Sequence, residues 1–256
     1  MEVLSGIALA GYLVVDAVKK GTPILGPNGI EENAVMLATI LSPLSLWPTF
    51  SLMSSKGVGS FNVLIVVSMF LNAAMWVMYG IEAKIPPAYL VNSIHLIFGA
   101  YYTFTYTRHA DGPQEQQALQ YIGRAVLVTA LIGAFMVFGD DQPVAKPGAA
   151  GETISYRGFI MGNICIVFNI LLYAAPLATL GEVLKTRSSS SLSMEQTVTN
   201  LTLSGGWLVA GIWRSDLPSI IPNGIGVVLS VVQLLLFLLF PAVGGQAKRA
   251  AKRKSN

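Results

Sequence analysis

The sequence predicts an all-α integral membrane protein with seven transmembrane helices, arranged as two three-helix repeats joined by one linking helix (3+1+3). Three observations predict this fold class. The 256 residues are 53% hydrophobic and only 11% charged, whereas a soluble domain carries about 25% charged residues. Several apolar stretches are long enough to cross a bilayer, and polar landmarks of the first half recur in the second.

A spanning helix needs roughly 20 mostly apolar residues to cross about 30 Å of hydrocarbon. Seven stretches are candidates, in chain order 33–53, 61–81, 86–106, 121–139, 158–180, 192–213 and 219–241. The fourth is the weakest, because Arg124 lies near its start and Gly133 and Gly139 interrupt it. The sixth is unusually polar, with three threonines in residues 197–202, which side chains facing other helices or a cavity would explain.

The two ends of the chain fall outside these stretches. The apolar run 3–18 lacks the basic segment of a signal peptide and contains Asp16, so we interpret residues 1–32 as an extracellular N-terminal segment. Residues 242–256 form a basic tail that holds five of the sixteen Lys and Arg. Because basic flanks stay cytosolic, the tail predicts a cytosolic C-terminus, and seven spans then put the N-terminus outside.

The tail also bears on location. Its lysines third and fifth from the end resemble a retrieval signal of the endoplasmic reticulum, although contact with anionic lipid explains the same charges. We favour contact with anionic lipid over a retrieval signal. We therefore expect the protein in the plasma membrane, with an internal membrane as the alternative location.

An internal repeat relates the two halves of the chain. One constant shift, from Trp76 to Trp207, also carries Gly80 onto Gly211, Pro87 onto Pro218 and Asn92 onto Asn223. We call this alignment the repeat register. The segments 42–44 and 175–177, each with a central proline, align at a slightly longer shift.

The predicted organisation follows from the repeat. It has a first repeat at 33–106, a linker helix with flanking loops at 107–157, and a second repeat at 158–241. The repeats then run in the same direction, related by an axis along the membrane normal.

Four repeated residues are the candidate binding site: Trp76, Asn92, Trp207 and Asn223. Their positions near the ends of neighbouring spans put them at similar depth, at about 1.5 Å per residue. An indole face packs on the C–H face of a pyranose, and a carboxamide offers donors and acceptors to hydroxyl groups, so the site suits a neutral sugar or polyol. A single Trp in the interfacial belt, or an Asn in an interhelical hydrogen bond, would be the ordinary alternative.

Ionisable residues inside membrane spans usually mark proton or ion coupling, and the predicted span interiors hold almost none besides His95. This favours passive, uncoupled movement and argues against an enzyme. His95 follows Asn92 by three residues and shares its helix face, so it flanks the pocket or is a packed neutral histidine. One cysteine, Cys165, excludes an intramolecular disulfide and a cysteine metal cage. We expect no metal, no cofactor and no nucleic-acid partner.

Two prolines lie within predicted spans at matched positions. Pro43 and Pro176 each remove a backbone hydrogen bond and permit a bend. A matched pair of bends suits the closure of one mouth of a transport path, and a static kink is the alternative.

Several local motifs resemble the SWEET sugar transporters. They are Ala-Ala-Pro-Leu-Ala-Thr at 174–179, Lys-Thr-Arg-Ser at 185–188, Trp207 with Gly211, and Pro-Asn-Gly-Ile-Gly at 222–226. The resemblance covers about residues 33–241. It implies two parallel three-helix bundles joined by an inversion linker helix, and bidirectional, proton-independent diffusion of mono- or disaccharides by alternating access.

The resemblance also implies roles for single residues. The pocket of the family falls on the same two Trp and two Asn, its extracellular gate on Tyr79 and Asp216, and its intracellular hinge on Pro43 and Pro176. The chain departs from the family pattern in three places. It lacks the proline usual in the second helix of each repeat, where Ser193 stands in the second repeat; Ala210 replaces a second gate tyrosine; and Pro48 is extra.

Two bulky indoles in the pocket favour hexoses over disaccharides, and Leu172 points the same way. Leu172 and Thr39, one turn before each hinge proline, are expected to flank the pocket. The expected partners are the sugar and the lipid bilayer, with a homo-oligomer left open. The alternatives are a seven-helix receptor or a membrane-partner protein without transport activity. A retinal protein is excluded, because residues 219–241 contain no lysine for a Schiff base.

Overall fold

The computed structural model describes residues 29–241. The predicted N-terminal segment up to residue 28 and the basic tail therefore lie outside the described residues. The described residues divide into two compact units, one of residues 33–165 and the other of residues 29–32 with 166–241. We call them the first and the second unit and treat each by itself.

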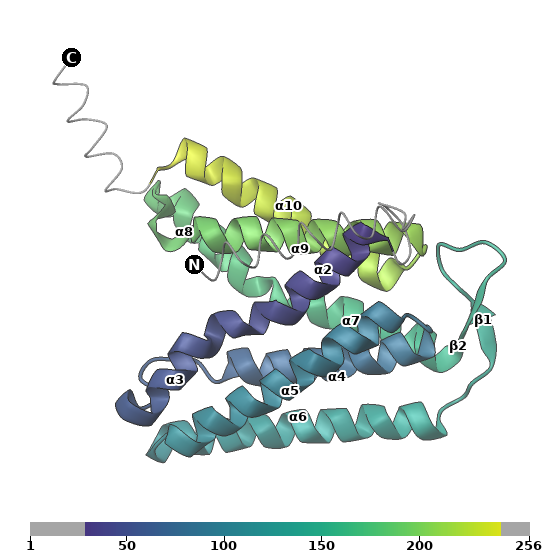
Figure 1. Ribbon diagram of the computed structural model, residues 1–256, viewed down its shortest axis with the longest axis horizontal. Helices are drawn as coiled ribbons and strands as arrows, with labels where there is room; N and C mark the ends of the chain where they lie inside the picture. Colours follow the sequence, from purple (N-terminus) through teal and green to yellow (C-terminus); the bar gives the residue numbers. More distant parts are fainter. Residues whose placement is uncertain (1–28, 242–256) are drawn as a thin grey trace. The chain divides into compact units, whose positions relative to one another are not determined.

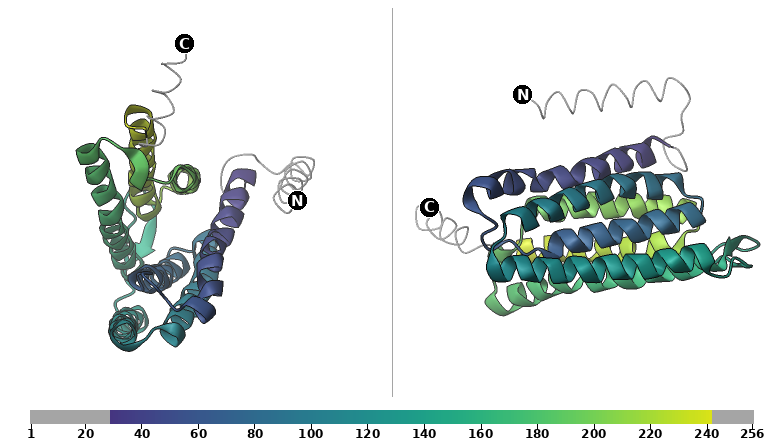
Figure 2. Two further views of the ribbon diagram at one scale, coloured as in Figure 1. Left: turned by 90° about the vertical axis from the view of Figure 1, so that its left-hand side faces the viewer. Right: turned by 90° about the horizontal axis from the view of Figure 1, so that it is seen from below.

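The first unit contains most of the first repeat, the linker helix and a small hairpin (Figure 1). Its elements are the rest of α2 (Ile30–Leu41), the 3-10 helix η1 (Ser42–Leu46), α3 (Trp47–Lys56), α4 (Leu64–Glu82), α5 (Pro86–His109), α6 (Gly112–Phe138), β1 (Pro143–Ala145), β2 (Thr153–Ser155) and the start of α7 (Tyr156–Leu172). Helices α4, α5 and α6 run along one another and contact one another (Figure 2).

The second unit contains the end of α7, α8 (Ala174–Thr186), η2 (Ser189–Ser191), α9 (Met194–Trp213) and α10 (Leu217–Leu239). Helices α9 and α10 lie side by side (Figure 1). A small apolar cluster of Leu180, Val183 and Leu236 joins α8 to α10. The first unit has a larger core, in which the rings of Phe50 and Tyr102 lie 4.4 Å apart between centroids.

Five helical segments of the described chain are long and apolar enough to cross a membrane. They are Glu32–Lys56, Leu64–Glu82, Gly112–Phe138, Tyr156–Thr186 and Leu217–Leu239. Helices α5 and α9 have 24 and 20 residues and carry more polar side chains. With these two, the described residues form seven helical segments, each overlapping one predicted span. Many large apolar side chains remain exposed, as expected where lipid replaces water.

The fourth span is the one most altered from its prediction. Instead of a short and weak helix from residue 121, α6 begins at Gly112 and has 27 residues, the longest α-helix among those described. Pro113 stands in its first turn with Glu115, and both are favourable near a helix start. The following glutamines form helix well but are polar, so a search for apolar stretches misses them.

The segment after α6 was predicted as loop and contains a hairpin. Strands β1 and β2 pair antiparallel, with Val144 opposite Ile154. Beyond the strands, the Lys146 Nζ lies 2.8 Å from the Glu152 carboxylate and closes the hairpin tip. The hairpin brings Ser155 to the start of α7, where it meets the ion pair described below.

Both spans that contain a predicted hinge proline are interrupted. Helix α2 ends at Leu41, and η1, which contains Pro43, separates it from α3. Helix α7 ends at Leu172 and α8 begins at Ala174, two residues before Pro176. Because proline lacks an N–H, each proline removes one helix hydrogen bond near its interruption, which permits the chain to depart from a regular helix there.

Candidate functional site

The turn from α4 to α5 has the same backbone as the turn from α9 to α10. Lys84 and Ser215 both have a positive φ, of 54° and 49°. The next residue in each turn donates its N–H to a glycine carbonyl, Ile85 to Gly80 at 2.8 Å and Asp216 to Gly211 at 2.9 Å. These residues correspond to one another in the repeat register, so the sequence repeat is also a repeat of backbone structure.

The glycine before each turn permits a close approach of two helices. A Cβ on Gly80 would lie 2.8 Å from the backbone nitrogen of Tyr89, and a Cβ on Gly211 would lie 3.0 Å from the Cβ of Ser219. Only glycine fits such contacts without a shift of the neighbouring helix. The repeated glycine therefore sets the spacing of the helix pair that carries the candidate Trp and Asn.

Asn92 and Asn223 have the same environment in their own units. The Asn92 Nδ2 donates to the Ala88 carbonyl at 2.8 Å, and the Asn223 Nδ2 donates to the Ser219 carbonyl at 2.8 Å. Both side chains are half-buried. This contact uses one N–H of each carboxamide, so the second N–H and the oxygen are not engaged by it.

The two tryptophans differ in their surroundings. Trp76 is buried and meets the ring of Tyr79 edge to face, with centroids 5.7 Å apart. Trp207 is half-buried, and Ala210 stands where a partner equivalent to Tyr79 would be. The structure thus brings Trp76 and Tyr79 together in the first unit, and the position aligned with Tyr79 in the second unit is an alanine.

Asp216 begins α10 and is 1% exposed. The Ser219 hydroxyl donates to its carboxylate at 2.5 Å, and the helix N-terminus favours the negative charge. Tyr79 is also 1% exposed. The pairing of Tyr79 with Asp216 as a gate concerns the two units together and stays a prediction, as does the convergence of the four pocket residues.

The residues predicted to flank the pocket lie at the helix interruptions. In the first unit the His95 Nε2 lies 2.7 Å from the Thr39 carbonyl. That carbonyl would normally accept from residue 43, which is a proline, so His95 replaces a missing helix bond together with the Ser42 hydroxyl. Since a carbonyl only accepts, His95 must carry a proton on Nε2. Leu172 is the last residue of α7 and is exposed.

The sequence did not reveal two tyrosines that hold proline carbonyls. The Tyr102 hydroxyl donates to the Pro43 carbonyl at 2.8 Å in the first unit. In the second unit the Tyr173 hydroxyl donates to the Pro222 carbonyl at 2.6 Å. Both link the first helix of a repeat to its third. Both tyrosines lie in predicted spans, but their acceptors are backbone atoms distant in sequence.

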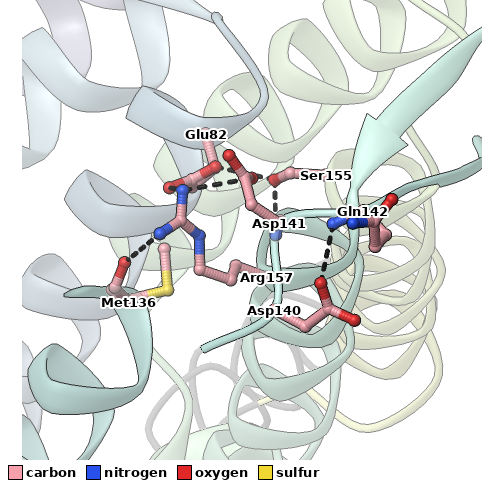
Figure 3. Close-up of polar contacts among 8 residues, drawn as sticks. Glu82, Met136, Asp140, Asp141, Gln142, Ser155 and Arg157 are labelled. Carbon is pink, nitrogen blue, oxygen red and sulfur yellow. Dashed lines mark hydrogen bonds and ion pairs between the residues drawn. The ribbon is translucent and has the colours of Figure 1, made fainter. Parts of the chain in front are cut away.

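An ion-pair cluster was also missed (Figure 3). The Arg157 Nη2 lies 3.4 Å from the Glu82 Oε1 and 3.1 Å from the Asp141 Oδ1. The Arg157 Nη1 donates to the Met136 carbonyl at 2.8 Å, and the Ser155 hydroxyl donates to Glu82 at 2.7 Å. The cluster joins the end of α4, the end of α6 and the start of α7 in the first unit. The second unit has its own ion pair, between Arg214 and Glu32.

A pocket of about 320 Å³ lies among α4, α5 and α6 of the first unit. Its lining is apolar apart from two threonines and includes none of the predicted binding residues, so it does not suit a sugar, which needs convergent polar groups. The lining residues are Val67, Phe70, Ala100, Thr103, Phe104, Thr107, Ile122, Ala125 and Val126.

Comparison with known proteins identifies a family. The profile of the family described as "Sugar efflux transporter for intercellular exchange" matches residues 29–112 and again residues 159–243. The bidirectional sugar transporter SWEET4 of Oryza sativa subsp. indica is 28% identical over 230 residues, which are 88% of this chain and 83% of that protein. The sugar transporter SWEET1 of Caenorhabditis elegans is 33% identical over 171 residues, 67% of this chain and 51% of that protein.

The fold has a counterpart among solved structures. A eukaryotic SWEET transporter solved at 3.7 Å superposes with a TM-score of 0.70 at 23% sequence identity, covering 82% of this chain and 97% of that one. The predicted all-α membrane fold is thereby confirmed.

Proposed function

Because this chain belongs to the SWEET family of sugar transporters, we propose that it is a hexose uniporter that works in both directions, without proton coupling, by alternating access. The family accounts for a multi-pass membrane protein that transports sugar and is not an enzyme. The choice of hexose, the independence from protons and the alternating-access mechanism are the parts that we propose.

The observation that carries the proposal is the repeated arrangement around Asn92 and Asn223. Two helix pairs with the same turn, the same close glycine contact and the same Asn-to-carbonyl bond present a carboxamide at the same point of each repeat. A neutral donor and acceptor pair in a membrane span suits sugar hydroxyls and does not require an ion.

We assign the sugar pocket to Trp76, Asn92, Trp207 and Asn223. In each repeat the indole offers an apolar face for the C–H face of a pyranose, and the unengaged carboxamide atoms bind hydroxyl groups. Two indoles leave less space than smaller polar side chains would, which favours glucose-like monosaccharides over sucrose.

The gates follow from the same family roles. Tyr79 and Asp216, both at the ends of helices next to the repeated turns, form the outer gate. The interruptions at Pro43 and Pro176 are the hinges of the inner gate, and a short 3-10 segment such as η1 is a common hinge structure.

In the second repeat Ser193 stands where the family pattern has a proline. Its side chain accepts from the Gln196 N–H at 3.2 Å and caps the start of α9. A serine cap and a proline both favour the beginning of a helix, so Ser193 begins α9 where the family uses a proline.

The orientation rests on charge. We propose an extracellular N-terminus, a cytosolic C-terminus and residence in the plasma membrane, with assembly into a homo-oligomer left to experiment. The basic tail supports this orientation.

Uptake of radiolabelled glucose, fructose and sucrose into transport-deficient cells tests the proposal. We expect glucose or fructose to enter down its gradient, with sucrose slower, at rates that do not change when the proton gradient is collapsed. Dependence on the gradient would defeat uniport. Surface-expressed protein that moves none of the sugars would favour a receptor or a membrane-partner protein.

A further inference from the structure

Two ion pairs each join the end of one helix to the beginning of another. Glu82, the last residue of α4, pairs with Arg157 at the start of α7. Arg214, directly after α9, pairs with Glu32 at the start of α2. In each pair the end of one repeat's second helix meets the beginning of the other repeat's first helix.

The charges of the two pairs are reversed. The second helix contributes the carboxylate in the first pair and the guanidinium in the second pair. In the repeat register Glu82 aligns with Trp213, and Arg214 aligns with Ala83. Neither pair is therefore a copy of the other, and the two repeats reach the same linkage with unrelated residues.

Both pairs are largely removed from solvent. The side chains of Glu82 and Arg157 are each 18% exposed, and those of Arg214 and Glu32 are 17% and 2% exposed. Partly buried ion pairs are screened less by salt than exposed ones. A second contact of 2.7 Å joins the Arg214 Nη2 to Glu32.

The bonding of Arg157 is incomplete in one respect. Its Nη atoms bind Glu82, Asp141 and the Met136 carbonyl, but its Nε is buried and finds no partner among the described residues. An unsatisfied buried donor lowers the net stability of such a contact. Several bonds therefore hold the Glu82–Arg157 contact together, while the unsatisfied Nε lowers its stability. This balance suits a contact that opens and closes.

The pairs adjoin the proposed outer gate. Glu82 lies three residues after Tyr79, and Arg214 lies two residues before Asp216. Lys84 and Ser215, whose φ angles are positive, lie two residues after Glu82 and one residue after Arg214. Alternating access requires the two repeats to separate at one end at a time.

We propose that the pairs Glu82–Arg157 and Glu32–Arg214 are two latches of the outer gate, which hold the helix ends together and break when the outer mouth opens. This inference rests on the proposed alternating-access function. None of the four latch residues belongs to the proposed sugar pocket.

Cross-linking tests whether the first latch must open. The variant Glu82→Cys with Arg157→Cys is treated with a short reducible bis-thiosulfonate reagent in cells that take up labelled hexose. The one native cysteine, Cys165, is buried. We expect cross-linking to lower uptake about tenfold or more and reduction to restore it, because a locked gate removes one of the two states that transport needs.

The hairpin supplies a matched control. Lys146→Cys with Glu152→Cys replaces another ion pair of the first unit, which closes a single hairpin. Its cross-linking should leave uptake within about twofold, since the hairpin need not open for the repeats to separate. Full uptake by the cross-linked Glu82–Arg157 variant would overturn the latch.

A charge series decides the question where the cysteine pair proves inactive before cross-linking. Glu82→Gln should lower the half-saturation concentration for external sugar about two- to fivefold, because a weakened latch populates the outward-open state. Glu82→Arg with Arg157→Glu should return it toward the native value. A merely structural role would reduce surface protein and leave half-saturation unchanged, and that result counts against the latch.

The two proposals fail separately. A native protein that moves no sugar contradicts the proposed function. A native protein that moves sugar, with a cross-linked variant that moves it equally well, contradicts only the latch.

Discussion

The two repeats agree at their turns and differ at their hinge helices. The α4–α5 and α9–α10 turns share backbone angles, glycine contacts and Asn bonds. At the interruptions the first repeat uses His95 of α5 to bind the Thr39 carbonyl of α2, whereas the second uses Tyr173, which follows α7, to bind the Pro222 carbonyl of α10. In both repeats the bond joins the first and third helices. The donor lies on the third helix in the first repeat and on the first helix in the second repeat.

A glycine makes that exchange possible. Gly226 aligns with His95 in the repeat register. A Cβ on Gly226 would lie 2.9 Å from the Tyr173 hydroxyl and 2.5 Å from the Ser204 hydroxyl. The second repeat therefore has no side chain at the aligned position and fills the space with a tyrosine from the first helix. The turns tolerate little change because backbone atoms meet there, while the hinges are tied by side chains that can be exchanged.

The largest expected effect tests the shared part of the comparison. Asn92→Ala and Asn223→Ala should each lower hexose uptake about tenfold or more, because each removes hydrogen bonds to sugar hydroxyls. Transport assays normalised to surface protein measure this. Asn163→Ala is the matched control, since the Asn163 Nδ2 makes the same bond to a carbonyl four residues earlier, Phe159, on an exposed face of α7. Similar losses in all three variants would indicate a structural role for the carboxamides.

The glycine contacts should rank the two turns by stability. Gly80→Ala should destabilise by about 1–3 kcal/mol, as overpacking does, because its Cβ would meet a backbone nitrogen at 2.8 Å. Gly211→Ala should cost less, since its nearest neighbour is a side-chain atom at 3.0 Å. Thermal unfolding in detergent compares the two variants. Gly123→Ala, with nothing within 4 Å of its Cβ, is the control and should not lower the unfolding temperature.

For the hydrogen bonds at the helix interruptions we expect the larger loss of stability in the second repeat, the reverse of the order for the glycine contacts. Tyr173→Phe leaves the Pro222 carbonyl without its tyrosine donor and should cost about 1–2 kcal/mol. His95→Leu should cost less, because the Ser42 hydroxyl still donates to the Thr39 carbonyl at 2.8 Å. Thermal unfolding again gives the readout. A larger loss for His95→Leu would mean that the histidine has a role beyond this bond, such as contact with the sugar.

The smallest effect concerns the inner end of α9. Ser193→Ala should destabilise by about 1 kcal/mol through loss of the helix cap. Ser193→Pro replaces it with the family residue and should recover part of that stability. The unfolding temperatures of both variants are compared with that of the native protein. An unchanged temperature for Ser193→Ala would show that the cap contributes nothing.

The helix pattern was largely predictable because it depends on local properties. Apolar length located each of the seven segments, and the proline positions located both interruptions. The prediction was wrong for the start of α6, where polar residues with good helix propensity precede the apolar ones, and it missed the β1–β2 hairpin, which is too short for a pattern.

The candidate site was only partly predictable. The repeat register predicted matching environments for Asn92 and Asn223, which are set by residues four positions away on the same helix, and their sugar-binding role stays a prediction. It did not find Tyr173 with Pro222 or Arg157 with Glu82, because these contacts join segments far apart in sequence and have no counterpart at the aligned positions.

The sequence by itself determined the membrane class of the protein, its repeat and the turns that carry the proposed binding residues, because each follows from composition or from spacing along one helix pair. Only the tertiary structure decided which side chains bind the carbonyls of Thr39, Pro43 and Pro222, and which carboxylate each arginine meets. Those partners depend on where the ends of separate helices come together in space, which residue spacing along the chain does not contain.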